Sequence, residues 1–180
     1  DFNCNNNFTL TAGTFNPNSG TVVLASGSNA IVTNGSFYNL TITKGVYAVT
    51  LTGNCIVSNT LTFNSANTIS GADFEARGDI VFTSTNYFLS ASKIIVNGTG
   101  TQNCSGTGNS GLSFEINKIS GVLNYNSDIG FHRDYTYLTG TVNWNTYKAT
   151  FLNSWGGVIT SGNFNNLTIN KATYSLVITN

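Results

Sequence analysis

Gly35-Ser-Phe-Tyr-Asn-Leu-Thr-Ile-Thr-Lys44 recurs further along the chain as Gly162-Asn-Phe-Asn-Asn-Leu-Thr-Ile-Asn-Lys171, at an offset of 127. In both stretches apolar side chains alternate with Thr, Asn or Ser, which is typical of β-strands with one buried face. Extending the match without a gap aligns residues 8–53 with 135–180, with 15 identities in 46 positions. We therefore predict one domain, residues 1–180, with a 127-residue internal repeat that covers residues 8–134 and restarts at residue 135.

Shorter segments with the same alternation lie inside this repeat. Each holds period-two runs of about four to six residues, separated by clusters of Gly, Asn and Ser. Such clusters are typical of turns, and no window sustains the apolar spacing of an amphipathic helix. The sequence therefore predicts an all-β protein. The segments are about 19–33 residues long, the size of a unit in solenoid proteins, and begin at Phe8, Phe37, Thr60, Asp79, Leu112, Tyr135 and Phe164.

The segments can coil in parallel as a β-solenoid or fold back as an antiparallel sandwich. Like segments carry apolar residues at the same offset, as stacked turns require, whereas a sandwich needs no repeat. We therefore predict a parallel β-solenoid or β-helix, right-handed by default, of about six to seven rungs of about 19–33 residues. The aromatic residues Phe8, Phe37, Tyr135 and Phe164 hold one offset in their segments and are expected to stack internally.

Composition excludes several classes of protein. Charged residues make up only 8% of the chain, which argues against a charge-rich helical bundle or coiled coil. Seven acids balance seven bases, so we expect neither nucleic acid nor an anionic membrane as a partner. The hydrophobic fraction of 40% argues against disorder. No apolar run approaches the length of a spanning helix, which predicts no membrane span.

Residues with reactive side chains are few. Cys4, Cys55 and Cys104 lack the paired spacing of a zinc or redox site, and we predict buried thiols. The single histidine, His132, lies beside Arg133 and Asp134 and is expected to be an exposed corner residue. We predict no catalytic residue, no metal site and no cofactor, and therefore a protein that is not an enzyme.

One cluster of charges leaves two interpretations open. Alternation places Asp73, Glu75 and Arg77 on the same side of a strand, where they could grip a cation or a sugar. β-Helical polysaccharide lyases and hydrolases use such clusters, and this is the least favoured function. The favoured interpretation is a solvated strand face with a local ion pair worth under about 1 kcal/mol.

Four aromatic residues offer a second kind of site. If exposed, Trp144, Trp155, Tyr147 and Tyr137 could stack on sugar rings. They are the candidate binding residues of an alternative function, an adhesin segment that recognises glycans. Half-buried packing at the corners of the turns is the other interpretation.

Several stretches resemble the long β-helical repeat regions of very large bacterial and archaeal cell-surface proteins of the adhesin type. They are Asn97-Gly-Thr-Gly-Thr-Gln102, Phe114-Glu-Ile-Asn-Lys118, Tyr137-Leu-Thr-Gly-Thr-Val-Asn143 and Phe164-Asn-Asn-Leu-Thr-Ile-Asn-Lys171. The resemblance covers nearly the whole chain and implies an extracellular location and a structural role in a fibre or stalk, with no shared catalytic residues. Because both termini fall within a segment, we expect end-to-end stacking with continuing repeats or neighbouring copies.

Overall fold

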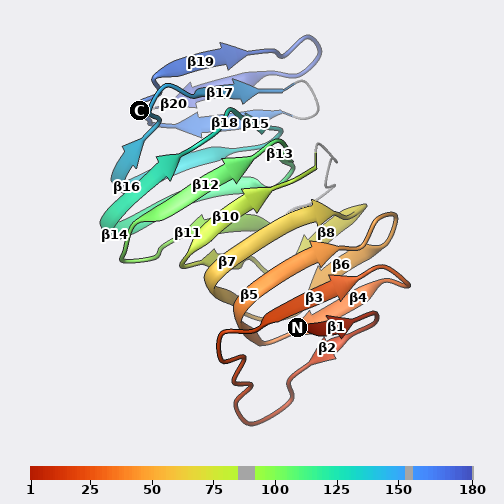
Figure 1. Cartoon of the computed structure of the whole chain (residues 1–180). Helices are drawn as coiled ribbons and strands as arrows, with labels where there is room; N and C mark the ends of the chain where they lie inside the picture. The colour runs from red at the N-terminus through yellow and green to blue at the C-terminus, as the bar shows by residue number, and fades with distance from the viewer. Residues whose placement is uncertain (85–91, 153–155, 180) are drawn as a thin grey trace.

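The chain winds as a parallel β-solenoid of about eight turns in the computed structural model, which describes residues 1–84, 92–152 and 156–179. Successive turns stack from β1 (Phe2–Cys4) at one end to β20 (Leu176–Thr179) at the other (Figure 1). Every strand pair among the described residues is parallel. The predicted solenoid is confirmed and the antiparallel sandwich is excluded.

The described strands lie on three faces, which we number in chain order. Face 1 contains residues 35–37 of β5 (Gly35–Thr43), 55–57 of β7 (Cys55–Ser65), β9 (Phe74–Ala76), β11 (Lys93–Val96), 113–116 of β14 (Ser113–Tyr125), 135–137 of β16 (Tyr135–Asn143), β18 (Gly157–Thr160) and β20. Face 2 contains β1, β3 (Thr21–Ala25), residues 39–43 of β5, 60–63 of β7, β10 (Asp79–Phe82), β12 (Gln102–Gly106), 122–125 of β14 and 141–143 of β16. Face 3 contains β2 (Phe8–Thr9), β4 (Ala30–Thr33), β6 (Ala48–Leu51) and β8 (Thr68–Gly71), then β13 (Asn109–Ser110), β15 (Ile129–Phe131), β17 (Lys148–Phe151) and β19 (Asn166–Ile169).

The turns are shorter and more uniform than the sequence segments. Paired residues on successive turns lie 18 positions apart at Val22 and Leu40, and 24 apart at Ile80 and Cys104, which are the two extremes. The predicted segments differ more widely in length because their first residues lie on different faces. Phe8 is on face 3 and Phe37 on face 1, so that segment covers more than one turn.

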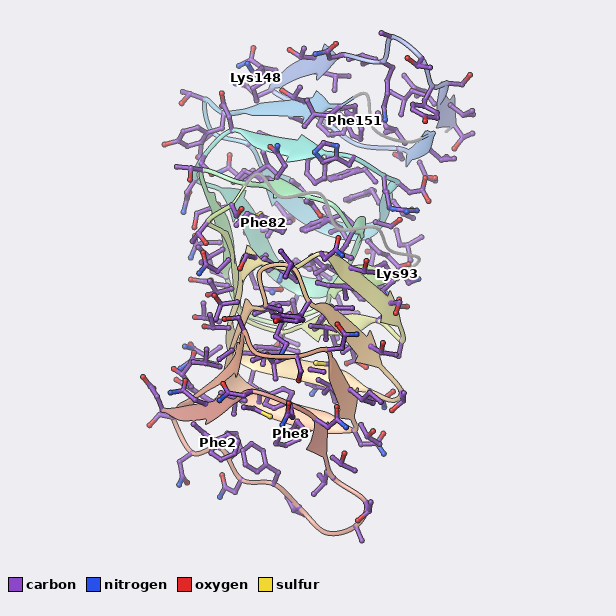
Figure 2. The ribbon with its side chains drawn as sticks, turned by 90° about the vertical axis from the view of Figure 1, so that its right-hand side faces the viewer. Phe2, Phe8, Phe82, Lys93, Lys148 and Phe151 are labelled. Carbon is purple, nitrogen blue, oxygen red and sulfur yellow. The ribbon has the colours of Figure 1, made fainter. Side chains whose placement is uncertain are left out.

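The alternation in the sequence builds the core directly. In β3 the side chains of Val22 and Leu24 point inward and are at most 2% exposed, while their neighbours along the strand lie at the surface. The same inward position on the next turns holds Ile42, Phe63 and Phe82 in register above Leu24. Burial of each such side chain is worth about 1.5–3 kcal/mol. Figure 2 shows the interior filled by side chains along the axis, with Phe82 and Phe151 inside.

The aromatic and cysteine predictions are confirmed by this core. Phe8 packs against Phe37 with ring centres 5.0 Å apart, and Tyr135 packs against Phe164 at 5.2 Å. The three cysteine thiols are free and buried. Burial raises the pKa of the Cys55 thiol far above its ordinary value, so this thiol stays protonated and packs as a small apolar group.

Candidate functional site

Among the described residues, six Asp and Asn side chains each link one turn to its neighbour. In every case a side-chain oxygen accepts a hydrogen bond of 2.8–2.9 Å from the backbone N–H of a residue 19–24 positions later, on the following turn. The bond satisfies a backbone donor that the strand ladder leaves unpaired at the corner. The acceptor and donor residues are Asn7 and Ile31, Asn29 and Ala48, Asp73 and Lys93, Asp79 and Asn103, Asp128 and Lys148, and Asp134 and Val158.

These bonds explain where the scarce acids are used. Of the seven acidic residues in the chain, Asp73, Asp79, Asp128 and Asp134 each accept a backbone bond from the next turn. A carboxylate in this position is held by the fold and has a structural role. The sequence reasoning missed this role, although the recurrence of Asn7 as Asp134, at the same offset of 127, was a usable signal.

The charged cluster predicted at residues 73–77 lies on face 1. Glu75 and Arg77 form an ion pair of 2.9 Å, and their side chains are 29% and 50% exposed. Asp73 does not join this pair and accepts instead from the Lys93 backbone. The cluster therefore has the local ion pair of the favoured interpretation, worth under about 1 kcal/mol at this exposure.

A second ion pair crosses from one turn to the next on the same face. Lys93 Nζ lies 2.6 Å from Glu115 Oε2, and this hydrogen bond raises the pKa of Lys93 above its ordinary value. An open hollow beside the pair is lined by Asp73, Lys93, Ser113, Glu115 and Asp134, among others. Its charged groups bond to each other or to the backbone of adjacent turns.

Two lysine ammonium groups are buried at the corners, which the sequence reasoning did not predict. Lys118 Nζ donates to Gly98 O at 2.5 Å, Gly100 O at 3.0 Å and Gln102 Oε1 at 2.7 Å, all on the preceding turn. Lys44 Nζ donates to Ala25 O at 2.6 Å and to Asn5 O at 2.8 Å, which lie one and two turns below. Burial lowers the pKa of both lysines, and the carbonyl oxygens compensate for the lost hydration.

The surface of face 2 carries a run of amide side chains. Asn59 Nδ2 donates to Asn39 Oδ1 at 2.7 Å, and Asn126 Nδ2 donates to Asn103 Oδ1 at 3.0 Å. These bonds run parallel to the axis, from one turn to its neighbour. The high Asn content of the chain thus adds side-chain bonds between turns beyond the backbone ladder.

The position predicted for His132 is wrong. Its side chain is 1% exposed, because it follows β15 into the interior of the corner instead of pointing to solvent. Burial is the main cause that lowers the His132 pKa from 6.5 to about 4, and the nearby charge of Lys171 adds to it. The imidazole is therefore neutral in the folded chain at neutral pH.

This shift predicts an acid sensitivity. Between pH 6.5 and pH 4 the unfolded chain binds a proton at His132 that the folded chain does not, so stability falls as the pH falls. We expect the free energy of unfolding to drop by about 1.5 kcal/mol between pH 6.5 and pH 5 through this group. Urea titrations at a series of pH values would measure it. His132→Gln should flatten the pH dependence in this window, and an unchanged slope would contradict the prediction.

The four aromatic residues proposed for glycan binding do not form one surface among the described residues. Trp144 is only 3% exposed and stacks on Tyr125 with ring centres 3.6 Å apart, so its ring packs inside and is not presented at the surface. Tyr137 and Tyr147 are half-buried, and the Tyr137 hydroxyl donates to Gly140 O. Trp155 lies outside the described residues. Trp144 lies inside because its large indole ring packs in the aromatic core of the last turns, where its burial is favourable.

The side-chain bonds described above join neighbouring turns. Among the described residues, no group of three or more His, Cys, Asp or Glu side chains could hold a metal ion. Within residues 1–84, 92–152 and 156–179 there is also no helix long and apolar enough to cross a membrane. Comparison of the chain with protein-family models, with curated proteins and with solved structures gives no match.

Proposed function

We propose that the chain is a structural module of an extracellular microbial fibre or giant cell-surface protein, in which it forms part of a long β-solenoid rod. One observation carries the proposal: charged and amide side chains link each turn to the next along the axis. Successive turns are bridged by the Asp and Asn side chains at the corners, by the Lys93–Glu115 pair and by the buried Lys44 and Lys118. These contacts oppose separation of the turns. A fibre pulled along its axis is under a force that would separate its turns.

A continuous core supports the same function. Inward residues on successive turns, such as Leu40, Leu61 and Ile80, touch in register and are fully buried. Each turn thus buries its neighbour, and stability grows with the number of turns. The resemblance to repeat regions of adhesin-type surface proteins supports the extracellular location. The partners we propose are further turns of the same kind, stacked end to end.

A lengthened chain tests the rod. Residues 54–180 are repeated directly after Asn180, which continues the 127-residue recurrence because Asn54 follows the equivalent of Asn180. We expect the particle to lengthen by about 30 Å at the strand spacing of about 4.8 Å per turn, with an unchanged cross-section in small-angle X-ray scattering. A version with a flexible Gly-Ser linker at the junction is the control. If both chains scatter as two jointed bodies, the rod is wrong.

The location is tested separately. Antibodies raised against this chain should label intact cells of the source organism in immunogold microscopy without permeabilisation. Labelling confined to permeabilised cells would contradict the extracellular part of the proposal and leave the rod untouched.

A further inference from the structure

We propose that the 127-residue repeat is six turns plus one face, so that each successive repeat places the same sequence on the next face of the solenoid. Six turns separate β3 from residues 141–143 of β16, both on face 2. β17, the equivalent of β3, lies one face further along the chain, on face 3. This one-face step goes beyond the proposed rod and is seen within the described residues of this chain, whether or not the chain forms part of a fibre.

The first support for a shift of one face comes from strand pairing. Thr21 pairs with Asn39 on face 2, and their equivalents Lys148 and Asn166 pair on face 3. The other equivalent pairs move in the same sense, from face 3 to face 1. Phe8 pairs with Val32 on face 3, and their equivalents Tyr135 and Ile159 pair on face 1. Ala30 likewise pairs with Val49 on face 3, and their equivalents Gly157 and Leu176 pair on face 1.

The corners repeat with the strands. Asn7 accepts from the Ile31 N–H at 2.9 Å, and the equivalent Asp134 accepts from the Val158 N–H at 2.8 Å. The tight turn in which Gly20 N donates to Pro17 O has its equivalent in Tyr147 N and Trp144 O. Asn18 and Asn145 share left-handed φ angles of 46° and 50°, and Asn34 and Ser161 share 51° and 59°. Backbone geometry has therefore moved to the next face together with the sequence.

Side-chain packing follows the same rule. The ring contact between Phe8 and Phe37 at 5.0 Å recurs between Tyr135 and Phe164 at 5.2 Å. Val22 and Leu24 point inward on face 2, and the equivalent Ala149 and Phe151 point inward on face 3. These agreements come from pairing, corner bonds, backbone angles and ring contacts, which are separate observations.

The physical reason is that the three faces are alike. Each consists of short parallel strands at one spacing, with alternate residues inward, so a strand sequence meets the same demands on any face. Six turns lead from Thr21 to Asn143, and the step onward to Lys148 completes the offset of 127. The repeat length therefore need not be a whole number of turns.

The shift of one face per repeat determines where the same outward residues recur on a longer rod. A set of outward residues recurs about 30 Å further along the axis and one face around, because six and a third turns rise by that amount at about 4.8 Å per turn. A partner that recognises one repeat meets the next copy of its site on the neighbouring face. The rod thus offers a helical path of sites, suited to partners that surround it, and no single face keeps the same residues.

Paired cysteines test the step in the present chain. Thr136 is the equivalent of Thr9 on face 3, yet it lies beside Glu115 on face 1. We expect Glu115→Cys with Thr136→Cys to form a disulfide under mild oxidation, seen as a mass loss of about 2 Da, because Cα partners on adjacent strands are within disulfide reach. A repeat of whole turns would put residue 136 over face 3 and join it to Asn109→Cys instead. Formation of that second pair, or of neither, would overturn the inference.

A segment exchange gives a second measurement. It tests whether the faces are interchangeable, independently of whether the chain forms part of a longer rod. Residues 30–44 are replaced by the sequence of residues 157–171, which comes from the next face, with the sequence of residues 158–172 as a control shifted by one position. We expect the thermal midpoint of the exchange to stay within about 5 °C of the parent, whereas the control, which turns polar residues inward, should lose its cooperative transition. Equal loss in both chains would show that the faces are not interchangeable, whatever the lengthened chain does.

Discussion

Gly78→Ala is expected to destabilise the solenoid by about 4 kcal/mol. Gly78 lies at the corner between β9 and β10. A Cβ atom there would lie 1.9 Å from the carbonyl oxygen of Asn59 on the preceding turn, and 2.5 Å from its carbonyl carbon. Both are backbone atoms, so no flexible side chain can move away, and the two turns must separate.

The cost arises from the stacking distance. Adjacent turns are held at the strand spacing of about 4.8 Å, and at this corner the backbones approach with no room for a side chain. Separating them also disturbs the bond from Gln102 Nε2 to Gly78 O, which is 2.6 Å long. Gly100→Ala is the matched control, since its Cβ would meet no atom within 4 Å. Denaturant titration of both variants measures the difference. If Gly78→Ala were as mild as Gly100→Ala, the close stacking at this corner would be wrong.

Lys118→Met is expected to cost about 4 kcal/mol in the free energy of unfolding. The ammonium group makes three hydrogen bonds of 2.5–3.0 Å, and the residue is 1% exposed. Methionine fills much the same space but donates nothing, so Gly98 O, Gly100 O and Gln102 Oε1 lose their donor. Each buried acceptor left without a partner costs about 1–3 kcal/mol.

Lys148→Met provides the control for this prediction. Lys148 is 45% exposed and lies 3.9 Å from Asp128, so its loss should cost less than about 1 kcal/mol. Figure 2 shows Lys148 at the outside of the coil. Denaturation of the two variants under the same conditions compares a buried with a surface ammonium group. Similar small losses would mean that the Lys118 bonds add little to cohesion between turns.

Much of the fold was predictable because it depends on local patterns. Alternation in stretches such as 39–43 predicts which side chains point inward, and the structure buries Leu40 and Ile42 as expected. The functional groups were harder to predict. His132 was expected at an exposed corner, and for Trp144 the sequence left exposure and half-buried packing open, but the neighbouring turns close over both. Burial of a corner residue depends on the turn above it, which local sequence does not reveal.

The buried lysines illustrate the same limit. Lys44 and Lys118 each belong to the end of a strand segment, where a charged residue ordinarily lies at the surface. Only the stacked backbone of the turns below supplies the carbonyl oxygens that make burial of an ammonium group tolerable.

The sequence by itself determined that this protein is all-β, that its turns are alike, and which residues of each strand face inward, because a period of two and a 127-residue recurrence are properties of the chain alone. Only the tertiary structure decided on which face each strand lies, that paired residues on successive turns are 18–24 positions apart, and that the repeat advances by one face. The physical reason is that alternation distinguishes inside from outside but not one face from another. The face is set by the stacking of corners whose bonds join residues a whole turn apart.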